Sequence, residues 1–222
     1  MNDEWPQVIS GIEYTLCALG DEDDMARLLS ENFVRHDPPA IAVGLTPEEF
    51  EAFVRLWSRA AASEGLTIVA RDVSTCQLVG ALLTDDAASP PPEGLDELSE
   101  KFDPIFDLLG QIDAEYRTER IIEPGQCLHL FLLGVAENFA RRKIGHHLVS
   151  VCLANGAHRG YTTAVTEATN LVSQHIFKQL GFRTRAVGSY RDYRLDGSPT
   201  FASIAEHGGP MTMDRTITTD HH

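Results

Sequence analysis

The segment from Cys127 to Phe182 restricts the possible folds of this chain more than any other part. Five expected elements follow one another in it: an apolar strand (Leu128–Val135), a basic turn (140–145), a helix (143–159), a strand (Thr162–Thr166) and a helix (Leu171–Leu180). Such a turn is a suitable site for phosphate, because the first helical turn leaves backbone N–H groups free and carries the positive end of the helix dipole. The segment therefore predicts an α/β arrangement with an anion-binding turn. A strand, a basic turn and a helix in this order nevertheless occur in many α/β domains.

The second helix adds a more specific pattern to the turn. It carries residues of defined type at fixed spacing: Asn170, Ser173, Ile176, Phe177, Gly181 and Phe182. Together with the turn it resembles the acyl-CoA-binding core of the GNAT N-acetyltransferase superfamily, which has an Asn-x-x-(Ala/Ser)-x-x-aliphatic-Tyr-x-x-x-Gly-Phe segment. The resemblance implies acetyl-CoA as the co-substrate and a reaction that needs no metal ion.

The basic turn departs from the pattern of that family. There the loop reads Gln/Arg-x-x-Gly-x-Gly/Ala, and its amides hold the pyrophosphate of CoA. The aligned residues here are Ala140, Lys143 and Gly145, so two of the three positions differ. The positive charges of Arg141, Arg142 and Lys143 could replace the lost contacts, and we expect phosphate binding to persist with a different loop geometry.

Composition excludes several classes of partner. The formal net charge of −15 argues against nucleic acid and suits a small cationic substrate, although solubility alone is the more ordinary explanation. No apolar run is long enough for a membrane span, and the acidic N-terminus lacks the features of a signal peptide. The four cysteines have no metal-ligand spacing and are expected to be reduced and mostly buried, so we expect a cytoplasmic protein.

The rest of the chain supplies further expected elements around this core. They are a strand (Gly11–Leu19), a helix from Asp21 that ends before Pro38-Pro39, a helix from Thr46, a hairpin (Leu66–Ala70 and Cys76–Leu83), a helical segment (Leu95–Tyr116) and three strands (Thr184–Asp192, Thr200–Ala205 and Met211–Thr218). At 222 residues we expect a single domain, with an insertion at 84–124, the acyl-CoA core at 126–182 and C-terminal strands at 183–218.

This order of elements resembles the GNAT fold. The resemblance implies a mixed α/β (α+β) class, with a mostly antiparallel central sheet, splayed central strands and flanking helices. The helix expected before the central strand narrows the resemblance to the insect arylalkylamine (dopamine-type) N-acetyltransferases, which carry segments similar to Asn32–Pro38, Glu100–Phe106 and Tyr190–Tyr193.

The resemblance implies direct attack of an amine on the thioester, for which a base must take a proton. It points to Asp37, at the position of a glutamate in the insect enzymes, although Asp37 could merely cap the Pro-Pro turn. The second candidate is His129, which aligns with a proton-shuttling histidine of the vertebrate enzymes. A strand histidine of this kind could equally be packed in the core.

Protonation of the departing thiolate needs an acid. Many family members use a tyrosine where this chain has Phe177, which has no proton to give. The resemblance points instead to hydroxyls at Thr169 and Ser173, and it implies that Asn170 and Phe177 contact the acyl donor, with Asn170 holding the pantetheine arm. The alternative is structural, with Thr169 capping the helix and Ser173 in its first turn.

The remaining expected contacts to the acyl donor come from two backbone segments. The central strand would bind the pantetheine and polarise the acetyl carbonyl, and the turn would hold the phosphates: Leu133, Gly134 and Val135; Ala140, Arg141, Arg142, Lys143, Ile144, Gly145 and His146. Gly134 would permit close approach of the substrate, unless it marks a bulge.

The sequence thus predicts an acetyl-CoA-dependent N-acetyltransferase that acts on a small primary amine, with arylalkylamines and polyamines as the candidate classes. Two alternatives stay open. One is a non-catalytic acyl-CoA-binding or sensing domain, favoured by the unusual loop and by Phe177. The other is acetylation of a protein. The expected assembly is a monomer or a homodimer.

Overall fold

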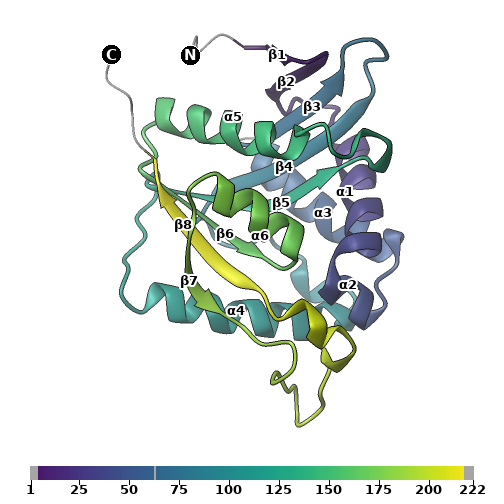
Figure 1. Cartoon of the computed structure of the whole chain (residues 1–222), viewed down its shortest axis with the longest axis vertical. Helices are drawn as coiled ribbons and strands as arrows, with labels where there is room; N and C mark the ends of the chain where they lie inside the picture. Colours follow the sequence, from purple (N-terminus) through teal and green to yellow (C-terminus); the bar gives the residue numbers. More distant parts are fainter. Residues whose placement is uncertain (1–4, 63, 218–222) are drawn as a thin grey trace.

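The computed structural model describes residues 5–62 and 64–217, which form one eight-stranded sheet flanked by helices (Figure 1). The strands run in the order β1-β2-β3-β4-β5-β6-β8-β7 across the sheet. Their bounds are Gln7–Ile9 (β1), Ile12–Leu16 (β2), Ile68–Asp72 (β3), Leu78–Asp86 (β4), Cys127–Val135 (β5), Thr163–Ala168 (β6), Arg183–Val187 (β7) and Met211–Thr216 (β8). Among these strands the pair β5 and β6 is parallel and the other neighbours are antiparallel, so the predicted fold class is confirmed.

Six α-helices in the described residues cover the two faces of this sheet. They are α1 (Glu22–His36), α2 (Pro38–Val43), α3 (Pro47–Ala62), α4 (Asp103–Arg117), α5 (Ile144–His158) and α6 (Leu171–Gln179). Figure 1 shows α5 and α6 across one face, with α1 and α3 behind the sheet and α4 along the end that holds β7 and β8. Short 3-10 turns occur at Leu95–Glu97, Glu100–Phe102, Glu137–Phe139 and Ala202–His207.

Local sequence signals account for the starts of α2 and α3. Thr46 and Glu49 form a reciprocal capping box, in which the Glu49 amide donates to the Thr46 hydroxyl and the Thr46 amide donates to the Glu49 carboxylate. The two prolines after Asp37 end α1 as predicted and also begin α2, where Pro38 needs no donor at the first helical position. The Asp37 carboxylate is thereby placed at a helix start.

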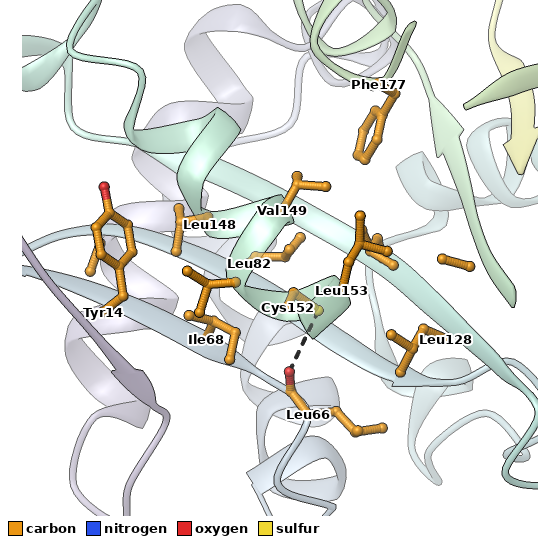
Figure 2. Close-up of a cluster of buried hydrophobic side chains, with 14 of the residues drawn as sticks. Tyr14, Leu66, Ile68, Leu82, Leu128, Leu148, Val149, Cys152, Leu153 and Phe177 are labelled. Carbon is orange, nitrogen blue, oxygen red and sulfur yellow. Dashed lines mark hydrogen bonds between the residues drawn. The ribbon is translucent and has the colours of Figure 1, made fainter. Parts of the chain in front are cut away.

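The core under α5 is aliphatic. Leu148, Val149 and Cys152 of α5 pack onto Leu82 and Leu128 of the central strands, and Figure 2 shows them with Tyr14 and Phe177 at the two ends of the cluster. The Cys152 thiol points to the Leu66 carbonyl at 3.8 Å. This packing holds the start of α5 against the end of β5.

The core on the opposite face is aromatic. Ring pairs with centroids 4.8–5.9 Å apart connect α3, the segment before α4, α4 and β5: Phe50, Phe53, Trp57, Phe102, Phe106 and Phe131. Phe53 is at the centre of this aromatic cluster and is 3% exposed. The predicted apolar stripe of α3 is therefore mainly core, and part of it also lines a cavity.

Two irregularities in β5 open the sheet at its centre. The pairing with β4 shifts between Leu130 and Leu132, so Phe131 is an extra residue in a bulge. The pairing with β6 is restricted to residues 127–129 and 163–165, and beyond His129 the two strands diverge. This divergence confirms the predicted splay. The bulge lies at Phe131, and the alternative that Gly134 marks a bulge is wrong, because Gly134 is in regular register with Ala81.

The structure corrects four expectations from sequence. Residues 200–205, expected as a strand, belong mainly to the 3-10 turn Ala202–His207, and Tyr190–Tyr193 is a turn rather than part of a strand. A short strand, β1, precedes the expected first strand and pairs with it through a turn at Ser10-Gly11. Cys76, expected in a strand, is exposed in the turn between β3 and β4. Turn residues explain the last two corrections, because positive φ angles at Ser10 and Cys76 are difficult to anticipate for non-glycine residues.

The described residues contain no helix that is both long and apolar enough to cross a lipid bilayer.

Candidate active site

A cavity of about 270 Å³ lies where β5 and β6 diverge, on the face covered by α1, α3 and α4. One part of its wall is the aromatic cluster defined above. The other part is polar and comprises Asp37, Asp113, Arg117, His129, Glu167, Thr169, Asn170 and Ser173. The cavity thus brings together all four predicted catalytic residues: Asp37, His129, Thr169 and Ser173.

Asp37 is a buried carboxylate, 5% exposed, in the junction between α1 and α2. One carboxylate oxygen accepts the Thr169 hydroxyl and the other accepts the backbone N–H of Ala40 at 3.2 Å. Burial raises the pKa of Asp37 to about 6, and the two hydrogen bonds limit that rise. The group is therefore mainly ionised at pH 7 and close to the range in which a carboxylate exchanges protons readily.

Thr169 connects Asp37 to the C-terminal part of the chain. Its hydroxyl donates to Asp37, while its carbonyl accepts the Tyr190 hydroxyl at 2.7 Å. Tyr190 is fully buried, and desolvation raises the pKa of its phenol far above the usual range, so it acts as a fixed donor. Although Tyr190 lies in a turn rather than the expected strand, it supports the segment that carries Thr169.

The residue that caps α6 differs from the alternative given above, in which Thr169 is the cap. Asn170, and not Thr169, caps the helix, because its side chain accepts the Ser173 amide at 2.8 Å. The Ser173 hydroxyl donates to the Asn170 carbonyl at 2.9 Å, so both groups are engaged locally. Phe177 is buried in the aliphatic core, where its ring contacts Phe182 at 5.0 Å between centroids.

His129 is held between two carboxylates. Its Nδ1 lies 2.9 Å from Asp85 Oδ1, and its Nε2 lies 2.8 Å from Glu167 Oε2. Desolvation opposes the charged ring, but Glu167 and Asp85 outweigh it and raise the pKa of His129 well above 6.5. In this arrangement the imidazolium has no lone pair to accept a proton. The geometry therefore gives no support to His129 as the base.

The same ionic group extends into the aromatic cluster. The Trp57 indole N–H donates to Asp85 Oδ2 at 3.0 Å. The His129 ring lies 5.0 Å from that of Phe131, between centroids. Trp57, Asp85, His129 and Glu167 thus form a continuous chain from α3 across β4 and β5 to β6. We refer to these four residues as the histidine relay.

The backbone edge of β5 beyond His129 faces the splay. Because β6 pairs with residues 127–129 alone, backbone groups on this edge from Phe131 to Val135 have no partner in β6. The Val135 carbonyl accepts Asn32 Nδ2 at 2.9 Å. A Cβ at Gly134 would come within 2.8 Å of Leu29 Cδ2, so the absence of a side chain here lets α1 pack closely against β5.

The basic turn before α5 presents free amides, as predicted. The first backbone bond of α5 runs from the His147 N–H to the Lys143 carbonyl, which leaves the amides of Ile144, Gly145 and His146 without helical partners. Lys143 provides no side-chain cap. The side chains of Arg141, Arg142 and Lys143 are all exposed.

The loop reaches this geometry without the expected glycine. Arg141 and Lys143 adopt φ angles of 64° and 59°, in the left-handed region that glycine favours. The guanidinium of Arg142 lies 4.9 Å from the centre of the Phe139 ring and donates to the Ser10 carbonyl at 3.4 Å. The His146 side chain is partly buried, and its Nδ1 has no hydrogen-bond partner among the described residues.

Sequence reasoning missed several groups that line or support the cavity. Glu167, Asp85 and Trp57 come together with His129 through the sheet order and not through any sequence motif. Two weak signals existed, because Asp85 is next to the last residue of an otherwise mainly apolar strand and Glu167 is the one charged residue of β6. In the described residues no three His, Cys, Asp or Glu side chains form a metal-binding group.

Comparison with known proteins gives a consistent result. The family model described as "Acetyltransferase (GNAT) family" matches residues 98–182, which include α4, the central strands and the basic turn. Arylalkylamine N-acetyltransferase 2 from Aedes aegypti is 21% identical, with a TM-score of 0.78 over 94% of this chain and 100% of its own. The predicted resemblance to the GNAT superfamily, in the layout of the insect enzymes, is thus confirmed.

Two other solved structures share this fold. An agmatine N-acetyltransferase, solved in its apo form as a point mutant, is 20% identical, with a TM-score of 0.77 over 93% of this chain and 100% of its own. The C-terminal condensation domain of Ebony, in complex with beta-alanyl-dopamine, is 17% identical, with a TM-score of 0.85 over 93% of this chain and 99% of its own. At these identities the likeness concerns the fold.

Proposed function

We propose, from the premise that this chain has the GNAT acetyltransferase fold, that it transfers an acetyl group from acetyl-CoA to a small primary amine. The observation that carries the proposal is the buried Asp37 carboxylate in the wall of an aromatic cavity, beside the splay of β5 and β6. The arylalkylamine and agmatine acetyltransferases of the same fold support an amine as the acceptor. The cavity walls favour an amine with a flat, apolar body.

Each chemical requirement of the reaction has a candidate group. Asp37 takes the proton that the amine must lose, and Thr169 orients the carboxylate by donating to it. Backbone N–H groups on the free edge of β5, near Leu133, stabilise the negative charge that develops on the thioester oxygen. Ser173 lines the cavity and is the hydroxyl that we assign to the departing thiolate.

The acyl donor would enter from the opposite face. The free amides at the start of α5 and the exposed cations of the basic turn bind the diphosphate of CoA. The pantetheine arm would then follow the free edge of β5, between that strand and Asn170, to the splay. This path places the thioester beside the cavity that contains Asp37.

A free-thiol release assay with acetyl-CoA tests this function. We expect turnover with members of a panel that contains phenethylamine, tyramine, agmatine and spermidine, and no thiol release without an amine. A protein that binds acetyl-CoA but turns over no amine would instead support the non-catalytic alternative. Activity confined to peptide amines would support acetylation of a protein.

The same assay can also identify which acyl group the protein prefers to transfer. The condensation domain of Ebony, which has a similar fold, was solved in complex with beta-alanyl-dopamine, that is, dopamine with a beta-alanyl group in place of a smaller acetyl group. The basic turn of this chain also departs from the usual glycine-containing pattern. Comparison of acetyl-CoA with beta-alanyl-CoA on the same amines determines which donor is preferred.

Neutralising the basic turn should weaken binding of the donor. We expect Arg141→Gln with Lys143→Gln to lower the affinity for acetyl-CoA by roughly tenfold, because two charge-assisted contacts to phosphate are lost. Isothermal titration calorimetry measures the change, and the affinity of the wild type should fall as salt rises. The matched control is Arg183→Gln, an exposed arginine of β7. Equal affinities of all three proteins would contradict the assignment of the turn.

A further inference from the structure

Glu167 has an unused hydrogen-bonding oxygen in the wall of the cavity. Its Oε2 is bound by His129 at 2.8 Å, whereas its Oε1 has no hydrogen-bond partner within residues 5–62 and 64–217. The side chain is 13% exposed, so little of it is accessible to bulk water. Since Glu167 lines the cavity and this oxygen can accept a further hydrogen bond, it is suited to a ligand that supplies a donor.

The histidine relay explains why the free oxygen is on Glu167 and not on Asp85. Asp85 uses both oxygens, one for the Trp57 N–H and the other for His129. Because a carboxylate without a proton can only accept, two carboxylates on one imidazole require the ring to carry both protons. The Asp85–His129–Glu167 group then has one net negative charge, and its one unsatisfied oxygen belongs to a residue that lines the cavity.

Glu167 and Asp37 both line the cavity, and Thr169, which is bound to Asp37, lies close to Glu167 in the chain. Glu167 is two residues before Thr169, about 7 Å along an extended chain, and both residues line the cavity. Asp37 is bound to Thr169 and marks the end of the cavity at which the amine reacts. The aromatic cluster flanks the space in between, so a flat molecule that reaches both ends fits.

We propose that Glu167 is a specificity-determining residue, which accepts a hydrogen bond from an O–H or N–H group at the far end of the amine substrate. The proposal rests on the function proposed above, with Asp37 at the reacting end. Phenolic hydroxyls of arylalkylamines and the guanidinium of agmatine supply the same donor chemistry. An amine that ends in a bare phenyl ring or a methyl group leaves this oxygen of Glu167 unpaired and therefore binds more weakly.

Binding of two matched pairs of amines tests this proposal. Tyramine is compared with phenethylamine, and agmatine with hexylamine, by calorimetry on the protein in the presence of coenzyme A. We expect the donor-bearing member of at least one pair to bind wild type roughly tenfold more tightly, as for a hydrogen bond to a charged group. Glu167→Gln keeps an acceptor for His129 but presents its NH₂ group to the cavity, so the preference should fall below about threefold.

The matched control is Glu115→Gln, which removes an exposed carboxylate on α4 and should leave the preference of wild type unchanged. Absence of a preference in both pairs on wild type, or an equal preference in wild type and Glu167→Gln, overturns the proposal. The comparison of the two amine pairs on wild type tests the proposal even if Glu167→Gln does not fold. Thiol release on the same amines separates the acetyltransferase function from the role of Glu167 in amine recognition. A binding preference without turnover refutes the proposed function and leaves the role of Glu167 intact.

Discussion

Asp37→Asn should lower kcat for amine acetylation by about 10²- to 10⁴-fold, the usual contribution of a positioned general base. Asparagine keeps the cap of α2, because its side-chain oxygen can still accept the Ala40 amide, so the fold should be preserved. Thiol release at saturating acetyl-CoA measures the effect. Circular dichroism and the melting temperature check that the variant is folded.

The pH dependence provides an independent test of the same assignment. The pKa of Asp37 is raised to about 6 by burial, and the base form is the carboxylate. The rate for wild type should therefore fall as pH decreases through about 6, and this acid limb should be absent from the residual activity of Asp37→Asn. Asp96→Asn, which changes an exposed aspartate in the 3-10 turn Leu95–Glu97, is the matched control. Full activity of Asp37→Asn would show that the proton leaves by another route.

Substitution of His129, the central residue of the histidine relay, should have the largest effect on stability. In His129→Leu, Asp85 and Glu167 lose the cation between them and remain 15% and 13% exposed, facing one another. We expect the free energy of unfolding to fall by about 3–5 kcal/mol, as found when one partner of a buried ion pair is removed. Urea unfolding at pH 7 measures the loss. His175→Leu, at an exposed position of α6, is the matched control.

The sign of the pH effect follows from the direction of the pKa shift. Because the pKa of His129 is raised on folding, its stabilisation is complete below the unfolded value near 6.5 and is lost as pH rises through the higher folded value. The stability of wild type should thus decline on the alkaline side, and that component should be missing from His129→Leu. The double variant His129→Leu with Glu167→Gln should recover part of the loss. A loss below about 1 kcal/mol would show that the relay is solvated.

The periodic segments of the sequence predicted the elements of the core with bounds close to those observed. Between Cys127 and Phe182 the expected strand, turn, helix, strand and helix all occur, because apolar periodicity and turn residues act over a few positions. The capping box at Thr46 and Glu49 was equally local. The expected strand at 200–205 was wrong, since its β-branched and aromatic residues pack in an irregular segment where tertiary contacts override propensity.

The candidate site was predicted in part. Asp37 and Thr169 are 132 positions apart in the sequence, and family resemblance rather than spacing brought them into one hypothesis. His129 is expected as a base or a packed residue, and the structure places its ring within hydrogen-bond distance of two carboxylates. Neither Asp85 nor Glu167 was a candidate, because strand residues become neighbours only through the order and register of the sheet.

The sequence alone predicted the segments of the core and the basic turn before α5, which depend on residues close together in the chain, whereas family resemblance pointed to Asp37 before the two prolines. Tertiary structure decided the bulge at Phe131, the aromatic cavity and the position of His129 between two carboxylates, which raise its pKa. These features depend on distances between strands and on exclusion of water. A pKa or a hydrogen-bond partner is fixed by the three-dimensional environment, which no local pattern of residues encodes.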